Sequence, residues 1–389
     1  MAGRLSRRSQ SKSAEGAPPR RRHGFLASLR LVLNRQPVYW ILYVTGRCNA
    51  RCDHCFLWRE IERADRSTEL TLDELRCLAA CIGPALVVNL AGGEPYLRND
   101  LCEIANLFSR HSGCRLMTIP SNGLMTDRIV ESAARLCDDN PNTFFRFSFS
   151  LDGIGPAHDA IRGVPGLFDR TCATVRRVAA LRARYHNFAV LTSTVFGAHT
   201  QGHILELMDW IEENLPVDQV NVTFVRGHPK YATTLQPERP LYDRVIERLV
   251  RPPGHRATRT PVDAAVSRAM FLNTLGTVAE AADNEGRRVF RCYAGRKFLV
   301  VDHHGDVYPC EMLGRDSCLG SLRDFGFDAH ALLASPKARE VIGRIRTGGC
   351  ACTWECAIQA SKAFDPLQWP GVLVRVAGLQ RPAALRRGA

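Results

Sequence analysis

Residues 43–58 of the chain read Tyr-Val-Thr-Gly-Arg-Cys-Asn-Ala-Arg-Cys-Asp-His-Cys-Phe-Leu-Trp. Cys48, Cys52 and Cys55 directly follow the apolar run 38–44 with the spacing C-x3-C-x2-C. Three thiolates bind three irons of a cubane cluster and leave the fourth iron open for a substrate or a second cofactor. A structural zinc site usually closes its shell with four ligands. The stretch therefore predicts an iron–sulfur cluster with one open iron at the end of a strand.

Packing is the other interpretation of these cysteines. On a helix, positions 48, 52 and 55 share one face, and buried cysteines commonly pack together in this way. Motifs further along the chain favour the ligand set.

The bulk composition excludes several classes of protein. The chain has 389 residues, 45% of them hydrophobic, which is enough for a main domain and a smaller one. No apolar run reaches the roughly 20 residues of a membrane span, and the run 25–33 is too short for a secretory signal. A cytoplasmic chain with 15 cysteines uses thiols for metals rather than for disulfides. We therefore expect a cytoplasmic protein without a membrane span.

The formal net charge of +13 is concentrated near both ends of the chain. Residues 1–22 contain almost no apolar side chains and are expected to be disordered. Residues 23–36 have the pattern of a short basic amphipathic helix, and a second basic tail begins at Arg375. We interpret the two tails as solvated and expect no nucleic-acid partner, although basic tails can also bind nucleic acid.

Apolar runs and helical patterns alternate from residue 37 onward. The runs that predict strands are 38–44, 85–91, 115–120, 144–151, 188–195 and 219–225. The helical patterns between them are 71–82, 99–111, 126–137, 168–186 and 203–214. This alternation predicts βαβ units and a parallel sheet, that is, an α/β fold. Six strands suit a partial (β/α)6 TIM-like barrel, in which active sites collect at the carboxyl ends of the strands.

Residues that could bind a ligand follow two of these strands. Gly92-Gly93-Glu94 follows the second run, and glycine lets a ligand approach the backbone closely. Ser150-Leu151-Asp152 ends the fourth run, and Arg162 follows twelve positions after the serine. A guanidinium holds a carboxylate with paired hydrogen bonds. Arg162 could alternatively be an exposed arginine on a helix surface, and Asp152 could alternatively cap the next helix.

A second group of cysteines lies in the C-terminal part: Cys292, Cys310, Cys318, Cys350, Cys352 and Cys356. The first two bracket an apolar run that predicts a β-hairpin with its turn near Gly305. A [4Fe–4S] cluster needs four thiolates, for which Cys292 and Cys310 come first. Cys352 and Cys356 complete the set, with Cys350 as competitor, and a zinc site of four cysteines is the alternative.

The remaining cysteines lie in helix or strand patterns and are expected to be buried packing residues. They are Cys77, Cys81, Cys102, Cys114, Cys137 and Cys172. The two histidines of the hairpin turn, His303 and His304, are expected to be exposed.

Over residues 37–362 these motifs resemble the radical S-adenosylmethionine (radical SAM) enzymes. The resemblance implies that Cys48, Cys52 and Cys55 hold a catalytic [4Fe–4S] cluster whose open iron binds S-adenosylmethionine (SAM). It also implies cofactor contacts for six residues. Gly92, Gly93 and Glu94 hold the amino group of the methionine moiety, Ser150 and Arg162 meet its carboxylate, and Asp152 contacts the ribose.

The C-terminal cysteines resemble the auxiliary iron–sulfur domains called SPASM or twitch. Gly305-x4-Cys310 matches their opening, but the block C-x2-C-x5-C-x3-C is missing, which implies one auxiliary [4Fe–4S] cluster rather than two. The expected organisation is a tail with a short helix at 1–36, a core barrel at 37–230, a helical connector at 231–285, the auxiliary domain at 286–362 and a basic tail at 363–389.

The resemblance implies reductive cleavage of SAM to a 5′-deoxyadenosyl radical and abstraction of hydrogen from a peptide or small-molecule substrate. The expected partner is a one-electron reductant of the flavodoxin or ferredoxin type. A non-catalytic iron–sulfur or zinc protein with basic nucleic-acid-binding tails is the alternative.

Deletion of residues 1–22 tests the interpretation of the N-terminal tail. We expect unchanged iron content and unchanged SAM cleavage, because this segment cannot bury enough apolar surface to fold. Iron analysis and the yield of soluble protein check this. A large loss of soluble protein after the deletion contradicts it and makes the tail structural.

Overall fold

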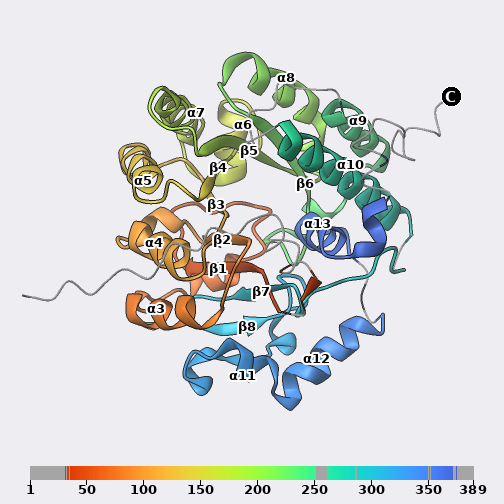
Figure 1. Cartoon of the computed structure of the whole chain (residues 1–389). Coiled ribbons are helices and arrows are strands. Elements are labelled where there is room, and N and C mark those ends of the chain that lie inside the picture. Colours follow the sequence, from red (N-terminus) through yellow and green to blue (C-terminus); the bar gives the residue numbers. More distant parts are fainter. Residues whose placement is uncertain are drawn as a thin grey trace, which may run out of the picture.

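The computed structural model describes residues 31, 33, 34, 36–250, 261–284, 287–348, 350, 352–370 and 374 (Figure 1). The predicted N-terminal tail and short helix at 1–36 lie largely outside these residues, as does most of the predicted basic tail at 363–389. Among the described helices, none has the length and apolar character needed to cross a membrane.

The first six strands form the predicted parallel sheet. They are β1 (Tyr39–Thr45), β2 (Val87–Gly92), β3 (Leu116–Ser121), β4 (Phe144–Ser150), β5 (Phe188–Phe196) and β6 (Gln219–Phe224). Each pairs in parallel with the next, in the order β6-β5-β4-β3-β2-β1. The five predicted helices are α3 (Leu72–Cys81), α4 (Leu101–His111), α5 (Thr126–Asp139), α7 (Leu167–Ala180) and α8 (Ile204–Asn214). The sheet is open, which confirms the partial barrel.

The sheet has a helix-covered outer face and a concave inner face. Side chains alternate along β1, so Trp40 and Leu42 enter the large core shared with the outer helices. Ile41 and Tyr43 enter a smaller core on the other face. Figure 1 shows α3, α4, α5 and α7 on the outer side, and α10 (Pro261–Asp283) and α13 (Glu355–Ala363) on the inner side.

The predicted C-terminal hairpin extends the same sheet. It consists of β7 (Phe298–Val301) and β8 (Asp306–Tyr308), which pair antiparallel around Gly305. Gly305 has φ +91°, a conformation that glycine adopts without strain. β7 pairs in parallel with β1, and β8 pairs with the short β9 (Gly320–Ser321). The sheet order is therefore β6-β5-β4-β3-β2-β1-β7-β8-β9.

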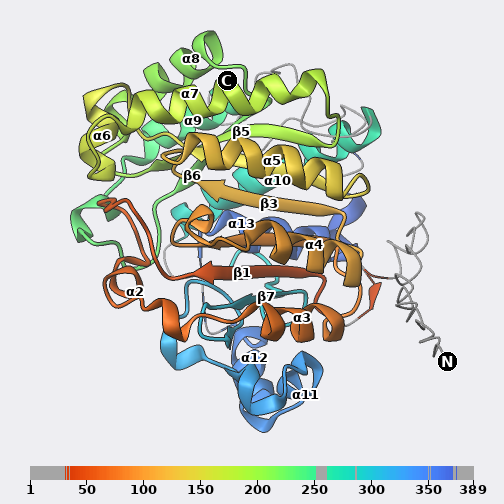
Figure 2. The same ribbon diagram turned by 90° about the vertical axis from the view of Figure 1, so that its left-hand side faces the viewer.

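Three further helices lie in the described part of the chain, of which the first contacts α8 and α10 and the other two contact each other. They are α9 (Arg239–Val250), α11 (Ala329–Leu333) and α12 (Pro336–Arg346). Two short helices, α2 (Trp58–Glu62) and α6 (Pro156–Arg162), follow β1 and β4. Figure 2 shows α2 and α6 on the left, where β1 and β3 end, so both lie beside the carboxyl ends of the strands.

The minor cysteines only partly follow the prediction. Four of them, Cys102, Cys114, Cys137 and Cys172, are buried as expected. Cys77 and Cys81 are exposed on α3, so the prediction was wrong for these two. The buried positions of α3 are Leu75, Leu78 and Ala79, and the two cysteines lie on the helix surface outside this stripe.

Phe298 tests how strongly the hairpin is joined to the core. Its ring is fully buried at the β1–β7 junction and contacts Trp354 at 5.7 Å between ring centroids. We expect Phe298→Ala to lower the free energy of unfolding by about 3–5 kcal/mol, as for other large-to-small core changes. Denaturant unfolding measures this, with Leu367→Ala as control because Leu367 is 78% exposed. Equal stability of the two variants contradicts the expectation.

Candidate active site

The loop between β1 and α2 brings the first three cysteines together. Burial raises the pKa of the Cys48 thiol to about 11 and that of Cys55 to about 12, and in both cases the nearby Cys52 raises it further. A bound metal ion reverses this, because a coordinating thiol is deprotonated. No three His, Cys, Asp or Glu side chains within the described ranges converge as ligands of a single metal ion. In a cubane each thiolate binds its own iron, so three thiols need not converge on one point. Cys52 lies close enough to both Cys48 and Cys55 to act on their pKa values.

The end of α6 holds the cysteine loop in place. The backbone N–H groups of Arg51 and Asp53 donate to the carbonyls of Arg162 and Ile161, both at 3.0 Å. The last carbonyls of a helix have no partner within the helix, so the loop satisfies two of them. Gly163 ends the helix at φ +66°. A Cβ at Gly163 would lie 3.2 Å from Arg51, so glycine also allows the close approach of the loop.

Arg162 and Asp152 form a buried ion pair next to Cys52. The Asp152 Oδ2 accepts from Arg162 Nε at 2.6 Å and lies 2.5 Å from Nη2, while Nη1 lies 3.5 Å from the Cys52 sulfur. Asp152 is fully buried, and its Oδ1 accepts from the backbone N–H of Val195 at 2.8 Å. Burial works to raise the pKa of Asp152, but Arg162 and its other neighbours bring it below the ordinary value.

Arg162 and Asp152, both predicted to contact SAM, thus contact each other in the structure. Arg162 is buried rather than exposed on a helix surface. Ser150 ends β4 on the inner face and pairs in register with Ser193 of β5. The predicted contacts of Ser150, Asp152 and Arg162 with SAM remain predictions.

Gly92 and Gly93 lie against the start of the cysteine loop. A Cβ on Gly92 would lie 2.3 Å from the carbonyl oxygen of Thr45, and one on Gly93 would lie 2.0 Å from that of Arg47. The N–H groups of Gly93 and Glu94 donate to these same carbonyls at 2.9 and 2.8 Å. The chain's own backbone therefore requires glycine at both positions, in addition to any ligand.

Glu94 connects the cysteine loop region to the end of β3. Its buried carboxylate accepts from the Ser121 hydroxyl at 2.9 Å and from the Asn122 N–H at 2.8 Å. Burial raises the pKa of Glu94 to about 7, against these hydrogen bonds. The Asn122 side chain continues the chain of contacts by donating to Asn49 Oδ1, between the first two cysteines, at 2.7 Å.

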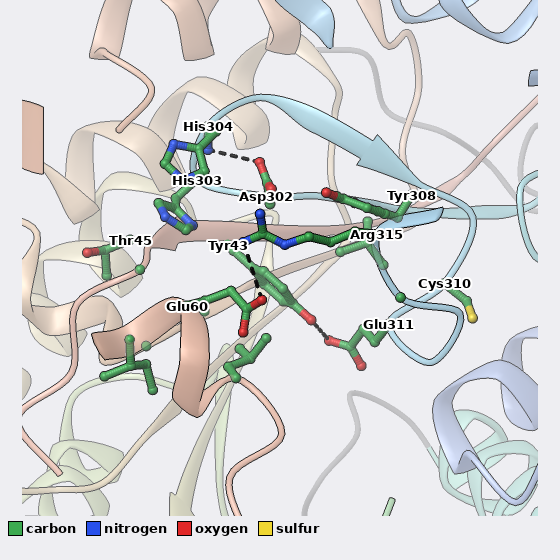
Figure 3. Close-up of a pocket in the computed structure, with 17 residues that line it drawn as sticks. Tyr43, Thr45, Glu60, Asp302, His303, His304, Tyr308, Cys310, Glu311 and Arg315 are labelled. Atoms are coloured by element: carbon green, nitrogen blue, oxygen red, sulfur yellow. Dashed lines mark hydrogen bonds and ion pairs between the residues drawn. The ribbon is translucent and has the colours of Figure 1, made fainter. Parts of the chain in front are cut away.

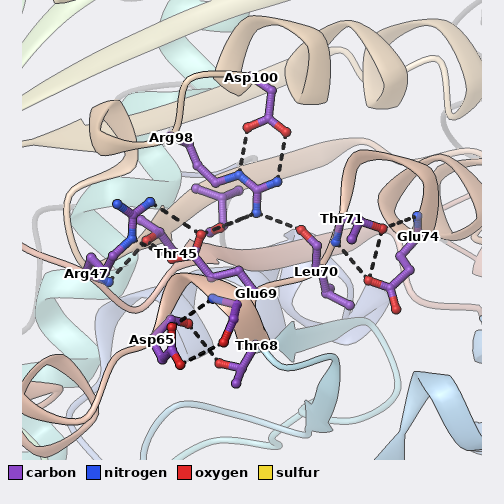
Figure 4. A network of polar contacts seen from close by, with 12 residues as sticks. Thr45, Arg47, Asp65, Thr68, Glu69, Leu70, Thr71, Glu74, Arg98 and Asp100 are labelled. Atoms are coloured by element: carbon purple, nitrogen blue, oxygen red, sulfur yellow. Dashed lines mark hydrogen bonds and ion pairs between the residues drawn. The ribbon is translucent and has the colours of Figure 1, made fainter.

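A polar network that the sequence analysis missed fixes the root of the loop (Figure 4). The Thr45 hydroxyl donates to Glu69, and Arg47 Nε donates to the same carboxylate at 3.0 Å. Arg98 donates to the carbonyl of Val44, at the end of β1, at 2.9 Å. Its guanidinium also bonds Asp100 at 2.8 and 2.9 Å. These single polar residues belong to no motif, so no sequence signal marked them.

Cys318 lies apart from the other C-terminal cysteines, near Asp302, Asp306 and Lys337. Burial raises the pKa of Cys310, with Cys292 and Cys352 as nearby thiols that raise it further. The pKa values of Cys292 and Cys352, also raised mainly by burial, are both influenced by Cys350. Cys292 therefore has Cys350 as a neighbouring thiol, and Cys352 has both Cys292 and Cys350.

Cys356 lies in a different environment. Burial raises its pKa to about 11, Arg226 opposes this, and Glu311 and Glu355 add to it. Tyr39 is a further neighbour of its sulfur. Cys356 therefore lies next to charged groups, and it also packs, together with Cys352, against the apolar cluster that contains Cys292 and Cys310.

A cleft joins the region of the cysteine loop to the C-terminal cysteines (Figure 3). Its volume is about 680 Å³ including the space open to solvent. Gly92, Gly93 and Thr45 line one part and Cys310 and Glu311 another. The complete lining is Tyr43, Thr45, Gly46, Leu57, Glu60, Ile61, Gly92, Gly93, Val300, Asp302, His303, His304, Tyr308, Cys310, Glu311, Gly314 and Arg315.

Several charged and polar side chains that line this cleft contact one another. The Tyr43 hydroxyl donates to Glu311 at 2.6 Å, and Arg315 pairs with Glu60 at 3.6 Å (Figure 3). His303 is buried at 4% exposure, so the prediction of an exposed histidine was wrong. Its ring packs against Gly46, where a Cβ would lie 2.6 Å from Nε2.

Two family models match the chain. Residues 42–211 match the Radical SAM superfamily, and residues 292–357 match SPASM, an iron–sulfur cluster-binding domain. The chain belongs to the radical SAM superfamily. This confirms the predicted family and the cofactors that go with it, a [4Fe–4S] cluster, SAM and auxiliary iron–sulfur binding.

Several known radical SAM proteins resemble the chain. The pre-heme d1 synthase of Dinoroseobacter shibae is 36% identical over 143 residues, which are 36% of this chain and 32% of that protein. The AdoMet-dependent heme synthase of Nitratidesulfovibrio vulgaris is 26% identical over 296 residues, 73% of this chain and 76% of that protein. The chain matches about a third of the length of the first three curated relatives.

The fold also resembles a solved radical SAM structure. The structure of native anSMEcpe with bound AdoMet has a TM-score of 0.55 at 17% identity, covering 88% of this chain and 100% of that one. This likeness supports the open α/β sheet with a C-terminal extension.

Gly93 offers a test of the loop geometry in this radical SAM protein. The Cβ of Gly93→Ala would collide with the backbone carbonyl of Arg47, which cannot move without shifting Cys48. We expect iron bound after anaerobic reconstitution to fall by about four per chain, one cubane. Gly202→Ala is the control, because nothing lies within 4 Å of its added Cβ. Equal iron content in the two variants refutes the proposed packing role.

Proposed function

We propose that this chain is a radical SAM enzyme that acts on a substrate held in the cleft between the cysteine loop and the C-terminal hairpin. One observation carries the proposal. Gly92 and Gly93, next to the predicted SAM site, and Cys310, among the C-terminal thiols, line the same cleft. When bound, the cluster and SAM supply a 5′-deoxyadenosyl radical that takes hydrogen from the substrate.

The residues around Cys52 prepare the loop for the cluster. Arg162 carries its positive charge to 3.5 Å from the Cys52 sulfur, and a nearby cation favours the thiolate over the thiol. Asp152 holds the guanidinium in place through two of its nitrogens. Since the loop amides of Arg51 and Asp53 bond the end of α6, loop and helix form one support for the three ligands.

The SAM contacts are proposed for the residues that meet near this support. Gly92, Gly93 and Glu94 would face the methionine amino group, and Ser150 and Arg162 its carboxylate. For Arg162 this contact requires a nitrogen that Asp152 does not occupy, and Nη1, now near Cys52, is such a nitrogen. Asp152 is committed to Arg162 and Val195, so a ribose contact is the less supported assignment.

For the auxiliary cluster we propose Cys292, Cys310, Cys350 and Cys352 as ligands. The pKa values of Cys292, Cys310 and Cys352 are each raised by at least one other thiol of this set, whereas the charged groups that act on Cys356 are Arg226, Glu311 and Glu355. A set with Cys356 in place of Cys350 is the competing assignment. Because Cys310 borders the cleft, a cluster at this site is placed to accept an electron from a substrate there.

A one-electron reductant of the flavodoxin or ferredoxin type completes the proposed system, which we place in the cytoplasm. The substrate is a peptide or a small molecule. The matched relatives are named as heme-type synthases and as GTP 3',8-cyclases, so their names do not agree on one substrate. Residues 231–285 of this chain are proposed as a helical connector between the core and the auxiliary domain.

The two clusters can be counted separately. After anaerobic reconstitution the wild type should bind about eight irons, and the triple variant Cys48→Ala, Cys52→Ala, Cys55→Ala about four. With dithionite and SAM, the wild type should form 5′-deoxyadenosine and the triple variant none. Iron analysis and chromatography of the products measure both results.

The outcome also decides the nature of the second site. A triple variant that binds zinc at one equivalent and no iron makes the C-terminal site structural and removes the electron-acceptor role. A single Cys350→Ala or Cys356→Ala change in the same background shows which of the two is a ligand, because only the ligand variant should lose the remaining iron.

A further inference from the structure

Arg146 lies in the middle of β4 on the concave face of the sheet. Its neighbours Phe145 and Phe147 are fully buried in the core under the outer helices, so alternation turns Arg146 to the opposite side. The register aligns Asn89 of β2, Thr118 of β3 and Arg146 directly across the strands. We call these three residues the polar row. Figure 1 shows α10 and α13 on this side of the sheet.

The polar row is partly accessible to solvent. Asn89, Thr118 and Arg146 are all partly exposed, although each lies on a strand that is paired on both sides. The outer face of these strands is covered by the large core. Their exposed surface therefore belongs to the concave side, which α10 and α13 leave partly uncovered.

Arg146 has no partner for its charge within the described part of the chain. Its Nε is shielded from solvent and has no hydrogen-bond partner, and no carboxylate of a described residue pairs with it. Burial lowers the pKa of the guanidinium, and only the Tyr39 hydroxyl opposes this. Asn89 Oδ1 is likewise buried without a partner. Buried polar groups are normally paired, and an unpaired buried cation is costly.

Arg226, a second arginine on this side of the sheet, has carboxylate partners within the protein. Its Nη1 donates to Glu355 at 3.0 Å, and Glu311 is a further nearby carboxylate. The charge of Arg226 is thus offset by the protein itself. Arg146 has no such carboxylate among the described residues.

Building on the proposed function, we propose that the polar row binds an oxyanion of the substrate, either a carboxylate or a phosphate. The guanidinium of Arg146 provides paired hydrogen bonds for such a group. The Thr118 hydroxyl and the Asn89 amide, turned to present its NH2, add two donors. In this proposal the rest of the substrate extends from the polar row toward the carboxyl ends of the strands, where the cysteine loop and the cleft lie. The substrate is therefore an acid, bound with its anionic group inward.

The test uses the full-length, anaerobically reconstituted enzyme and trifluoroacetate as probe. Saturable broadening of its ¹⁹F signal is measured for the wild type, Arg146→Met, Arg146→Lys and the control Arg184→Met, whose arginine is 72% exposed. We expect the affinity to fall at least about tenfold in Arg146→Met, because a hydrogen-bonded charge pair is lost. Arg146→Lys should recover part of it, and Arg184→Met should match the wild type. Competition by acetate or by inorganic phosphate identifies the preferred oxyanion.

Two further readouts separate the alternatives. Saturating SAM should leave the broadening intact, since SAM has its own carboxylate site. The melting temperature of Arg146→Met should not fall, because removing an unpaired cation relieves a cost. Unchanged broadening in Arg146→Met, displacement of the probe by SAM, or a lowered melting temperature would each overturn the proposal. Formation of 5′-deoxyadenosine by the wild type is measured separately, so failure of the radical chemistry is distinguished from failure of the anion site.

Discussion

The buried pair of Arg162 and Asp152 is the interaction on which the candidate site depends. Removing two charges from water costs several kcal/mol per ion, and only good geometry and further hydrogen bonds offset it. Here Arg162 uses two nitrogens on one carboxylate oxygen, and Val195 donates to the other oxygen. The pair joins the end of β4 to β5, to α6 and to Cys52. Loss of either partner would leave a buried charge directly beneath the cysteine loop.

Much of the fold follows from the sequence alone. Each strand of the parallel sheet is a β-rich apolar run. At the start of α3, Thr71 and Glu74 form a capping box, for which a threonine three residues before a glutamate is the usual sequence pattern. The hairpin turn also follows, because Gly305 takes a positive φ that few other residues tolerate. The placement of functional residues at strand ends is a property of the barrel, so it was predictable once the alternation was recognised.

Other features depend on contacts between distant segments. Pairing of β7 with β1 joins residues far apart in sequence, and nothing local in Phe298–Val301 specifies a partner. The choice between Cys350 and Cys356 depends on how the chain turns between them, which spacing does not determine. Glu69 and Arg98 are isolated polar residues whose partners, Thr45 and the Val44 carbonyl, lie on another element. Arg146 gives a further example, since in sequence it is one cation among aromatic strand residues.

The position of β7 has a consequence for how the protein is made. β1 ends at Thr45 and its edge partner begins at Phe298, so about 250 residues are synthesised between them. At the usual 5–20 residues per second, the edge of β1 waits for roughly 10–50 seconds. An unpaired strand edge is a template for wrong pairing. The free edge of β1 is therefore exposed to wrong pairing while the following residues are synthesised. Pairing with β7, in the last quarter of the chain, ends this exposure.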